Sequence, residues 1–317
     1  MANNRVTIMG SYVADVAFRV DRLPTWGETR MGQSFQLGPG GKGSNQAVAA
    51  ARAGANVAFI TKLGPDPFGE IARTLYRKEG IDTQYIFSSP NPTGAAAILI
   101  DAARGENAII VVPGACFELT AAEVDQATAL IATSSIFVAQ LELPLLTVEH
   151  GLRVAHAHGV PTILNPAPAA TLPNSIYPLC DYLTPNETEA TALTGVPVND
   201  LASAEVAASS LLALGVRNVI LTLGAQGALI KTPTLTRHIP AVNAGPIVET
   251  TGAGDAFNGG FATALAEGMD LIEATQFACA VAGISVTRPG TAPSMPHRPE
   301  IDAIRLASEA AEKVRFA

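Results

Sequence analysis

The sequence predicts an α/β fold in which helices flank both faces of a mostly parallel, doubly wound sheet. Short apolar runs alternate with helical stretches along the chain, and this order is typical of parallel strands joined by crossover helices. The crossovers are expected to be right-handed. Hydrophobic residues make up 48% of the 317 residues and charged residues 15%, which is ample for a buried core. We therefore expect a single α/β domain over residues 1–317.

Each element is predicted from its apolar pattern and its flanking residues. The strands are expected at residues 6–9, 56–63, 136–141, 162–165, 182–184 and 219–223. The helices are expected at residues 44–53, 67–78, 146–158, 187–193 and 202–214. Three of these helices are followed by glycine, at Gly54, Gly80 and Gly159, which is a common helix stop signal.

Strand-like residues occupy two regions that have no helix between their strands. In the second region, apolar runs flank Asp101–Asn107, and Gly105 lies near the turn, which is a hairpin signal. We expect the segments at about 12–37 and 93–113 to form a small antiparallel β lid over one end of the core. Such a lid would exclude water from an active site. The alternative is a plain extension of the main sheet.

Composition argues against several classes of function. The chain has 20 Lys and Arg against 28 Asp and Glu, a net charge of −8, and it has no basic run, so general nucleic-acid binding is not expected. No apolar run approaches the ~18 residues of a membrane span. The three cysteines are scattered and form no CxxC pair, which favours reduced thiols in a cytoplasmic protein.

A glycine-rich turn leads into an apolar helix within Glu249–Gly260. Gly252 and Gly254 leave room for a ligand to touch the backbone. The first amides of the helix and the positive end of its dipole would attract an oxyanion, typically phosphate. Asp255 stands at this junction, where a carboxylate can take a proton from an attacking hydroxyl. The alternative is an ordinary first-turn acid.

A second glycine cluster precedes the predicted helix at 44–53. Gly38, Gly40 and Gly43 have the spacing of the dinucleotide fingerprint GxGxxG. That fingerprint belongs at the first strand-to-helix turn, which here comes much earlier, so a nicotinamide-dependent dehydrogenase is disfavoured. What remains is a tight loop that offers backbone amides, Lys42 and Asn45, which suit the hydroxyls of a sugar.

Two further clusters follow predicted strands. Asn186 and Glu189 have the spacing of a capping box, yet Glu189 could equally hold a hydrated magnesium ion at this end of the sheet. Gly224 and Gly227 form either a plain turn or a loop for nucleotide phosphates. We expect residues of these clusters, together with Asp15 and Glu142 near other strand ends, to gather along one rim. The full set is Asp15, Lys42, Asn45, Glu142, Asn186, Glu189, Gly224 and Asp255.

Taken together, these residues resemble the ribokinase branch of the PfkB-type carbohydrate kinases, over essentially the whole chain. The motifs that carry the resemblance are Gly40–Ala47, Leu164–Ala169, Thr184–Glu189 and Gly252–Asp255. The C-terminal cation loop of that family resembles Val286–Gly290 followed by Pro293–Ser294. The resemblance implies transfer of the γ-phosphate of ATP to a sugar hydroxyl, with ribose O5 as the usual acceptor.

The resemblance also implies a role for each matching position. Asp255 would be the catalytic base, and the backbone amides of Gly252, Ala253, Gly254 and Asp255 would form the anion hole for the transferring phosphoryl group. The sugar would be held by Asp15, Gly41, Lys42, Asn45, Glu142 and Asp255. The nucleotide would be bordered by Asn186, Thr222, Gly224, Gly227, Gly254 and Cys279. Glu189 would order Mg²⁺ through water, and a monovalent cation, usually K⁺, would be held by Glu249, Thr251, Ser285, Arg288, Gly290 and Ser294. The lid would also form a homodimer contact.

Two positions depart from the family pattern. Val13 stands where ribokinases usually carry asparagine, so a partner for one ribose hydroxyl is missing. A kinase for 2-deoxyribose, or for another small sugar or nucleoside, is therefore the alternative to a ribose kinase. Glu249 stands where the family generally has aspartate, and its extra methylene could shift or abolish the cation site. A sugar sensor without catalysis would not need Asp255.

Overall fold

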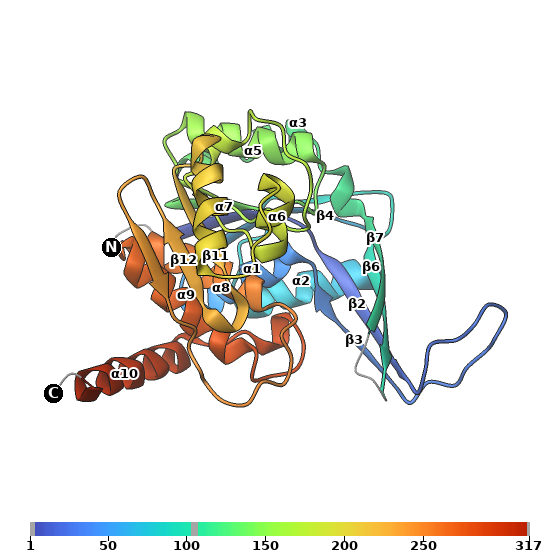
Figure 1. Ribbon diagram of the computed structural model, residues 1–317. Helices are drawn as coiled ribbons and strands as arrows, with labels where there is room; N and C mark the ends of the chain where they lie inside the picture. Colours follow the sequence, from blue (N-terminus) through green and yellow to red (C-terminus); the bar gives the residue numbers. More distant parts are fainter. Residues whose placement is uncertain (1–3, 103–106, 316–317) are drawn as a thin grey trace.

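A nine-stranded sheet forms the centre of the computed structural model, which describes residues 4–102 and 107–315 (Figure 1). The strands lie in the order β13-β12-β11-β10-β9-β8-β1-β4-β5. Their bounds are β1 Arg5–Met9, β4 Asn56–Leu63, β5 Ile86–Ser88, β8 Ile136–Ala139, β9 Thr162–Leu164, β10 Tyr182–Leu183, β11 Asn218–Thr222, β12 Ala228–Lys231 and β13 Thr236–Ile239. Neighbours from β11 to β5 pair in parallel, and β12 and β13 add an antiparallel edge, so the predicted mostly parallel sheet is confirmed.

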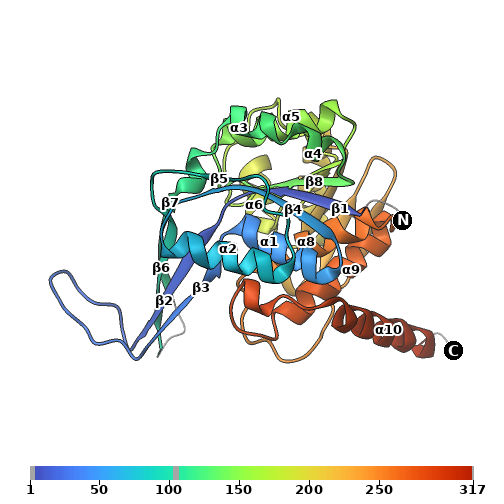
Figure 2. The same ribbon diagram turned by 180° about the vertical axis from the view of Figure 1, so that it is seen from behind.

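Helices cover both faces of this sheet, with α3, α4 and α5 over one face and α1, α2, α8 and α9 over the other (Figures 1 and 2). Their bounds are α1 Lys42–Ala53, α2 Pro67–Glu79, α3 Ala121–Gln126, α4 Thr128–Ala132, α5 Leu145–Ala157, α6 Glu187–Thr194, α7 Leu201–Ala213, α8 Ala253–Ala266, α9 Leu271–Ser285 and α10 Arg298–Arg315. None of the helices in the described ranges is long and apolar enough to cross a membrane.

The strands are apolar on both sides because each side faces a separate core. Ile8 and Phe59 pack into the core that includes α1 and α8, whereas Met9 and Ile60 pack into the core that includes α5 and α7. Successive residues of a strand point to opposite faces, so a strand buried on both faces is a continuous apolar run. Such runs are easy to identify in the sequence. The predicted bounds of these strands, and those of the predicted helices, agree with the structure to within two residues.

The strand order reverses beside β1, which lies between β8 and β4. The chain passes from β1 to β4 on one side and enters β8 later on the other side. In open α/β sheets, ligands bind beyond the carboxyl ends of the strands at such a reversal. Ser11 after β1 and Glu142 after β8 meet here through a hydrogen bond between the serine hydroxyl and the carboxylate.

The two segments predicted to form a lid make a separate four-stranded sheet at one end of the molecule (Figure 1), and we refer to this sheet as the lid. Its strands, in the order β3-β2-β6-β7, are β2 Val13–Val20, β3 Ser34–Gly40, β6 Thr93–Asp101 and β7 Asn107–Gly114. Each hairpin is antiparallel, as predicted, and the two hairpins join through parallel pairing of β2 with β6. Gly105, the predicted turn residue, lies outside the described residues.

One residue separates the lid from the first helix of the core. β3 ends at Gly40 and α1 begins at Lys42. Gly41, between them, has a φ of 85°, a left-handed conformation that favours glycine. A Cβ at Gly41 would lie 2.7 Å from the backbone nitrogen of Val13 in β2, so glycine also allows the two lid strands to approach here.

Candidate active site

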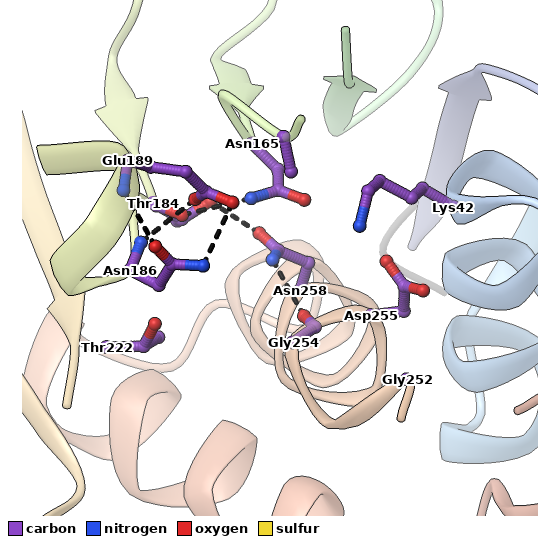
Figure 3. Close-up of a pocket in the computed structure, with 11 residues that line it drawn as sticks. Lys42, Asn165, Thr184, Asn186, Glu189, Thr222, Gly252, Gly254, Asp255 and Asn258 are labelled. Atoms are coloured by element: carbon purple, nitrogen blue, oxygen red, sulfur yellow. Dashed lines mark hydrogen bonds between the residues drawn. The ribbon is translucent and has the colours of Figure 1, made fainter. Parts of the chain in front are cut away.

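A pocket opens at the carboxyl ends of the strands, between the start of α1, the start of α6 and the start of α8 (Figure 3). It is lined by Lys42, Asn165, Ala167, Thr184, Asn186, Glu189, Thr222, Gly252, Gly254, Asp255 and Asn258. Lys42, Asn186, Glu189 and Asp255 belong to the predicted rim, so the structure brings these sequence-distant residues together.

Asp255 lies in the first turn of α8, whose N-cap is Gly252 with a φ of 82°. Its side chain is 6% exposed, and both carboxylate oxygens accept hydrogen bonds, from Asn45 Nδ2 at 3.0 Å and from Gln46 Nε2 at 3.1 Å. Burial raises the pKa of Asp255, and the Lys42 ammonium and these two amides oppose that rise. The carboxylate is therefore held by neutral donors and one nearby cation, and it faces the pocket.

The close contact between α1 and α8 has a glycine at its centre. A Cβ at Gly259 would lie 2.5 Å from Ala49 Cβ and 2.7 Å from the Gln46 carbonyl oxygen. Because Gly259 has no side chain, α1 can approach α8 closely enough for Asn45 and Gln46 to reach Asp255. The apolar face of α8 thus fixes the geometry of its polar first turn.

Lys42 supplies positive charge to a largely acidic site. Figure 3 shows the side chains of Lys42 and Asp255 pointing toward one another. The pKa of Lys42 is raised, first by Asp255 and then by Glu142 and Glu189. The backbone N–H of Lys42 also donates to Glu142 Oε2 at 2.9 Å. An anionic phosphoryl group would therefore meet a charged ammonium beside the amides of α8.

Asp15 and Asn45, both predicted to hold the sugar, lie near Asp255 but not among the residues that line this pocket. Burial, Glu142 and Asp255 raise the pKa of Asp15 to about 6. A Cβ at Gly40 would lie 2.3 Å from Asp15 Oδ2, so the absence of a side chain at Gly40 leaves room for this carboxylate. Asn45 Oδ1 is buried and has no hydrogen-bond partner among the residues that the structure describes. A buried unpaired acceptor beside a pocket is the group that a ligand hydroxyl would satisfy.

The other side of the pocket is formed by Asn186, Glu189 and Thr222. Asn186 caps α6, and Glu189 returns the bond to the Asn186 backbone N–H at 2.9 Å, so the predicted capping box is confirmed. Glu189 also faces the pocket while capping, so the two interpretations of this motif are compatible. Burial raises the pKa of Glu189.

The remaining predicted nucleotide residues do not line this pocket. Gly224 and Gly227 bound a short turn after β11, and each has a positive φ. A Cβ at Gly227 would lie 2.1 Å from the Ile239 carbonyl oxygen, so a structural need for glycine explains this position. Cys279 is 5% exposed on α9 and packs in the hydrophobic core, where burial raises the pKa of its thiol to about 12.

The segments predicted to hold a monovalent cation lie next to each other. Glu249 Oε2 accepts from the backbone N–H of Gly290 at 2.8 Å, which joins the two segments. The hydroxyl groups of Ser285 and Ser294 donate to backbone carbonyls, and the Arg288 guanidinium pairs with Glu300. Thr251 is exposed in the turn before α8. Within the described residues, no group of three or more His, Cys, Asp or Glu side chains is arranged to hold a metal ion.

Four pocket residues had no role assigned from the sequence: Asn165, Ala167, Thr184 and Asn258. Asn165 follows β9, and its Nδ2 donates to the Thr184 carbonyl at 3.1 Å. Asn258 lies one turn after Asp255, donates to the Gly254 carbonyl at 2.8 Å and accepts from the Thr184 hydroxyl at 2.6 Å. The signal that could have identified Asn165 and Asn258 is a lone polar side chain at a strand end or within an apolar helix.

Comparison with known proteins gives a consistent result. Residues 3–298 match the sequence profile of the pfkB family carbohydrate kinases. The chain is 45% identical to a ribokinase from Haemophilus influenzae over 296 residues, which covers 93% of this chain and 96% of that protein. It is 37% identical to a deoxyribokinase from Salmonella typhimurium over 294 residues, which covers 92% of this chain and 95% of that protein.

Solved structures show the same similarity in three dimensions. The ribokinase of Arabidopsis thaliana, solved in complex with ribose and ATP, superposes with a TM-score of 0.90 at 31% identity and covers 96% of this chain and 99% of that one. The ribokinase of Thermotoga maritima gives a TM-score of 0.87 at 37% identity and covers 94% and 98%.

Proposed function

Because the chain belongs to the pfkB family of carbohydrate kinases, we propose that it transfers the γ-phosphate of ATP to the O5 hydroxyl of D-ribose. The observation that carries this proposal is the position of Asp255 at the N-terminus of α8, between the Lys42 and Asn45 side of the pocket and the Asn186 and Thr222 side. A sugar on the first side and a nucleotide on the second would meet at this carboxylate. With ATP as co-substrate, we place the activity in the cytoplasm.

In the proposed reaction, Asp255 takes the proton of the sugar hydroxyl as its oxygen attacks the γ-phosphorus. The O5–P bond forms, the bond from the γ-phosphorus to the β,γ-bridging oxygen breaks, and ADP leaves. Phosphoryl transfer needs alignment and charge neutralisation more than covalent help, and the backbone amides from Gly252 to Asp255 are preorganised to stabilise the transferring group. Lys42 adds a positive charge at the same place.

The two ions that the family resemblance implies would bind at different places, Mg²⁺ in the pocket and K⁺ outside it. Mg²⁺ prefers oxygen ligands, keeps several waters and neutralises phosphate charge, and Glu189 presents a buried carboxylate for such waters. The oxygens of Glu189 already accept from Asn186, so contact through water suits this residue better than direct ligation. We propose that K⁺ would bind to backbone carbonyls near Glu249 and Ser294, since both hydroxyl and carboxylate side chains there are engaged within the protein.

We also propose a homodimer that forms through the lid. The two edge strands of the lid expose large apolar side chains, Phe35 in β3 and Ile110 and Val112 in β7, with exposed fractions of 60%, 67% and 61%. The exposed apolar run Ile109–Val112 in β7 suits an interaction surface. The mass in solution would test this, with Ile110→Lys expected to yield monomers.

A kinase for 2-deoxyribose is the second candidate. Val13 is 5% exposed in β2 and pairs with Gly40 and Gly94, so it brings no hydrogen-bonding side chain to the sugar side. 2-Deoxyribose lacks one hydroxyl of ribose. If the site has no hydrogen-bond partner for that hydroxyl, 2-deoxyribose loses less binding free energy relative to ribose. The 37% identity to a deoxyribokinase supports weighing this candidate.

The experiment that separates these candidates is a comparison of kcat/KM with ATP across ribose, 2-deoxyribose, a hexose and a nucleoside. We expect ribose to be preferred, and Val13→Asn to increase the ratio of ribose to 2-deoxyribose by about 10-fold, the effect of one hydrogen bond. The panel should be run with K⁺, with Na⁺ and with neither, which tests the cation proposal in the same assay. A preference for 2-deoxyribose would overturn the ribose assignment, and an unchanged ratio in the variant would overturn the role of Val13.

The pH dependence of sugar binding gives a further test. An ionised Asp15 would accept strong, charge-assisted hydrogen bonds from two sugar hydroxyls, and its pKa is raised to about 6. As the pH falls through this value, protonation weakens these bonds and turns one oxygen into a donor, so KM for ribose is expected to rise while KM for ATP stays nearly constant. Asp15→Asn should show a high KM that no longer changes over this range. A flat KM profile in the unmodified protein would contradict the assignment.

A further inference from the structure

We propose that Gln46 is a positioning residue for Asp255, and that Gln140 and Asn165 fix the orientation of its side-chain amide. This inference rests on the proposed kinase function, because it concerns the base of that reaction. Gln46 is completely buried in α1 and does not line the pocket, so it would act through Asp255 rather than through contact with a substrate.

The contacts of Gln46 account for every hydrogen-bonding group of its amide. Nε2 donates to Asp255 Oδ1 and to Asn165 Oδ1, both at 3.1 Å. Oε1 accepts from Gln140 Nε2 at 2.6 Å. An amide nitrogen has two N–H groups, so these three contacts leave Gln46 no spare donor and no freedom to rotate without breaking a bond.

The orientation of this amide follows from a backbone carbonyl. The carbonyl oxygen of Thr184 can only accept, so Asn165 must turn its Nδ2 toward it, as the 3.1 Å contact shows. Asn165 then presents its Oδ1 to Gln46. Because Oδ1 only accepts, Gln46 must donate to it through Nε2. The same nitrogen reaches Asp255, both of whose oxygens accept an N–H, and an ionised carboxylate accepts such bonds more strongly than a protonated carboxyl group. The network from Thr184 to Asp255 is therefore matched to the charged form of the base.

Gln140 holds the other end of the amide, and a glycine makes room for it. A Cβ at Gly10 would lie 2.2 Å from Gln140 Oε1, so Gln140 packs directly against the end of β1. Its Oε1 is buried without a hydrogen-bond partner in the described part of the chain. Gln140 thus uses its donor for Gln46 while its own acceptor stays unpaired, an arrangement with a free-energy cost. Among the residues that the structure describes, Gln140 makes this one side-chain hydrogen bond, to Gln46.

Electrostatics give the network a measurable consequence. Asp255 is faced by Lys42 from α1, Glu142 after β8, Glu189 from α6 and Asp15 from β2. The three carboxylates favour the protonated form of Asp255, and Lys42 favours the ionised form. Donation from Gln46 lowers the pKa of Asp255, so removing that donation should raise it while the four charged neighbours stay in place.

The test is the pH profile of kcat for Gln46→Met, which keeps the length of the side chain and removes its amide. We expect kcat to fall by about 10- to 100-fold, the range for a hydrogen bond to a charged group, and the acidic limb of the profile to move to higher pH. KM for ATP should change little. Gln140→Met, which leaves the bond from Gln46 to Asp255 in place, should move the limb in the same direction by less. Gln126→Met, at the exposed end of α3, is the matched control and should match the unmodified protein.

The outcomes separate this inference from the proposed function. If the unmodified protein phosphorylates no sugar, the proposed function fails. If it is active and Gln46→Met lowers kcat equally at every pH, Gln46 has a purely structural role and the inference is overturned. An unchanged kcat would overturn it as well. Gln46→Glu has the same shape and places a second carboxyl group beside Asp255, so it should move the acidic limb upward even if Gln46→Met proves too unstable to assay.

Discussion

Asp255→Asn is expected to lower kcat by about 10²- to 10⁴-fold, the usual contribution of a general base. The substituted amide cannot take a proton from the sugar hydroxyl. It also cannot accept from both Asn45 and Gln46, because one of its two terminal atoms becomes a donor. Steady-state kinetics with ribose and ATP would measure the effect, and KM for ATP should stay close to its original value.

Asp270→Asn provides the matched control for this substitution. Asp270 is also an aspartate at the start of a helix, where it caps α9 and is exposed. Asparagine caps helices about as well as aspartate, so kcat and stability should be nearly unchanged. Retention of most activity by Asp255→Asn would refute the assignment of the base.

Gly259→Ala is expected to impair both stability and catalysis. Alanine in a helix normally stabilises it by about 1 kcal/mol relative to glycine. Here the new Cβ would lie 2.7 Å from the Gln46 carbonyl oxygen and 2.8 Å from the Ala50 nitrogen, which are backbone atoms that can move only if α1 itself shifts. We expect a net destabilisation of about 1–3 kcal/mol in urea unfolding, as for overpacked cores. A shift of α1 would also draw Asn45 and Gln46 away from Asp255 and lower kcat.

Gly151→Ala in α5 separates steric conflict from helix propensity. A Cβ at Gly151 would lie 2.6 Å from Met9 Cε, the end of a flexible side chain that can change rotamer. Gly151→Ala should therefore lower the free energy of unfolding by less than Gly259→Ala does, and kcat should be nearly unaffected. Equal destabilisation by the two substitutions would argue against a special role for the contact between α1 and α8.

The sequence predicted the core elements well because their signals are local. The run at 56–63 is apolar on both faces, and β4 has those bounds in the structure. The strand predicted at 136–141 ends at Ala139 instead, since Leu141 turns away and donates to the Ala167 carbonyl. That partner is distant in sequence, so no local pattern could have indicated the change. The parallel pairing of β2 with β6 is equally non-local.

The candidate site was predictable where a residue type is unusual for its position. Asp255 after two glycines and Lys42 within a glycine loop are conspicuous, and both line the pocket. The role of Gln46 could not be predicted from the sequence, because a glutamine in an alanine-rich helix has no distinctive signal. Its importance comes from contacts with Asn165 and Asp255, which lie 119 and 209 positions away in the chain. Such networks become visible when the fold is known.

Gly41 alone joins the last strand of the lid to the helix whose first residue, Lys42, lines the pocket. The strand that ends at Gly40 continues directly into Lys42, whose backbone N–H binds Glu142. The Thr291 hydroxyl fastens the same joint by donating to the Pro39 carbonyl at 3.1 Å. A displacement of the four-stranded sheet would therefore be transmitted to the first turn of α1, so admitting a sugar and aligning the groups that receive it would be parts of one mechanical movement.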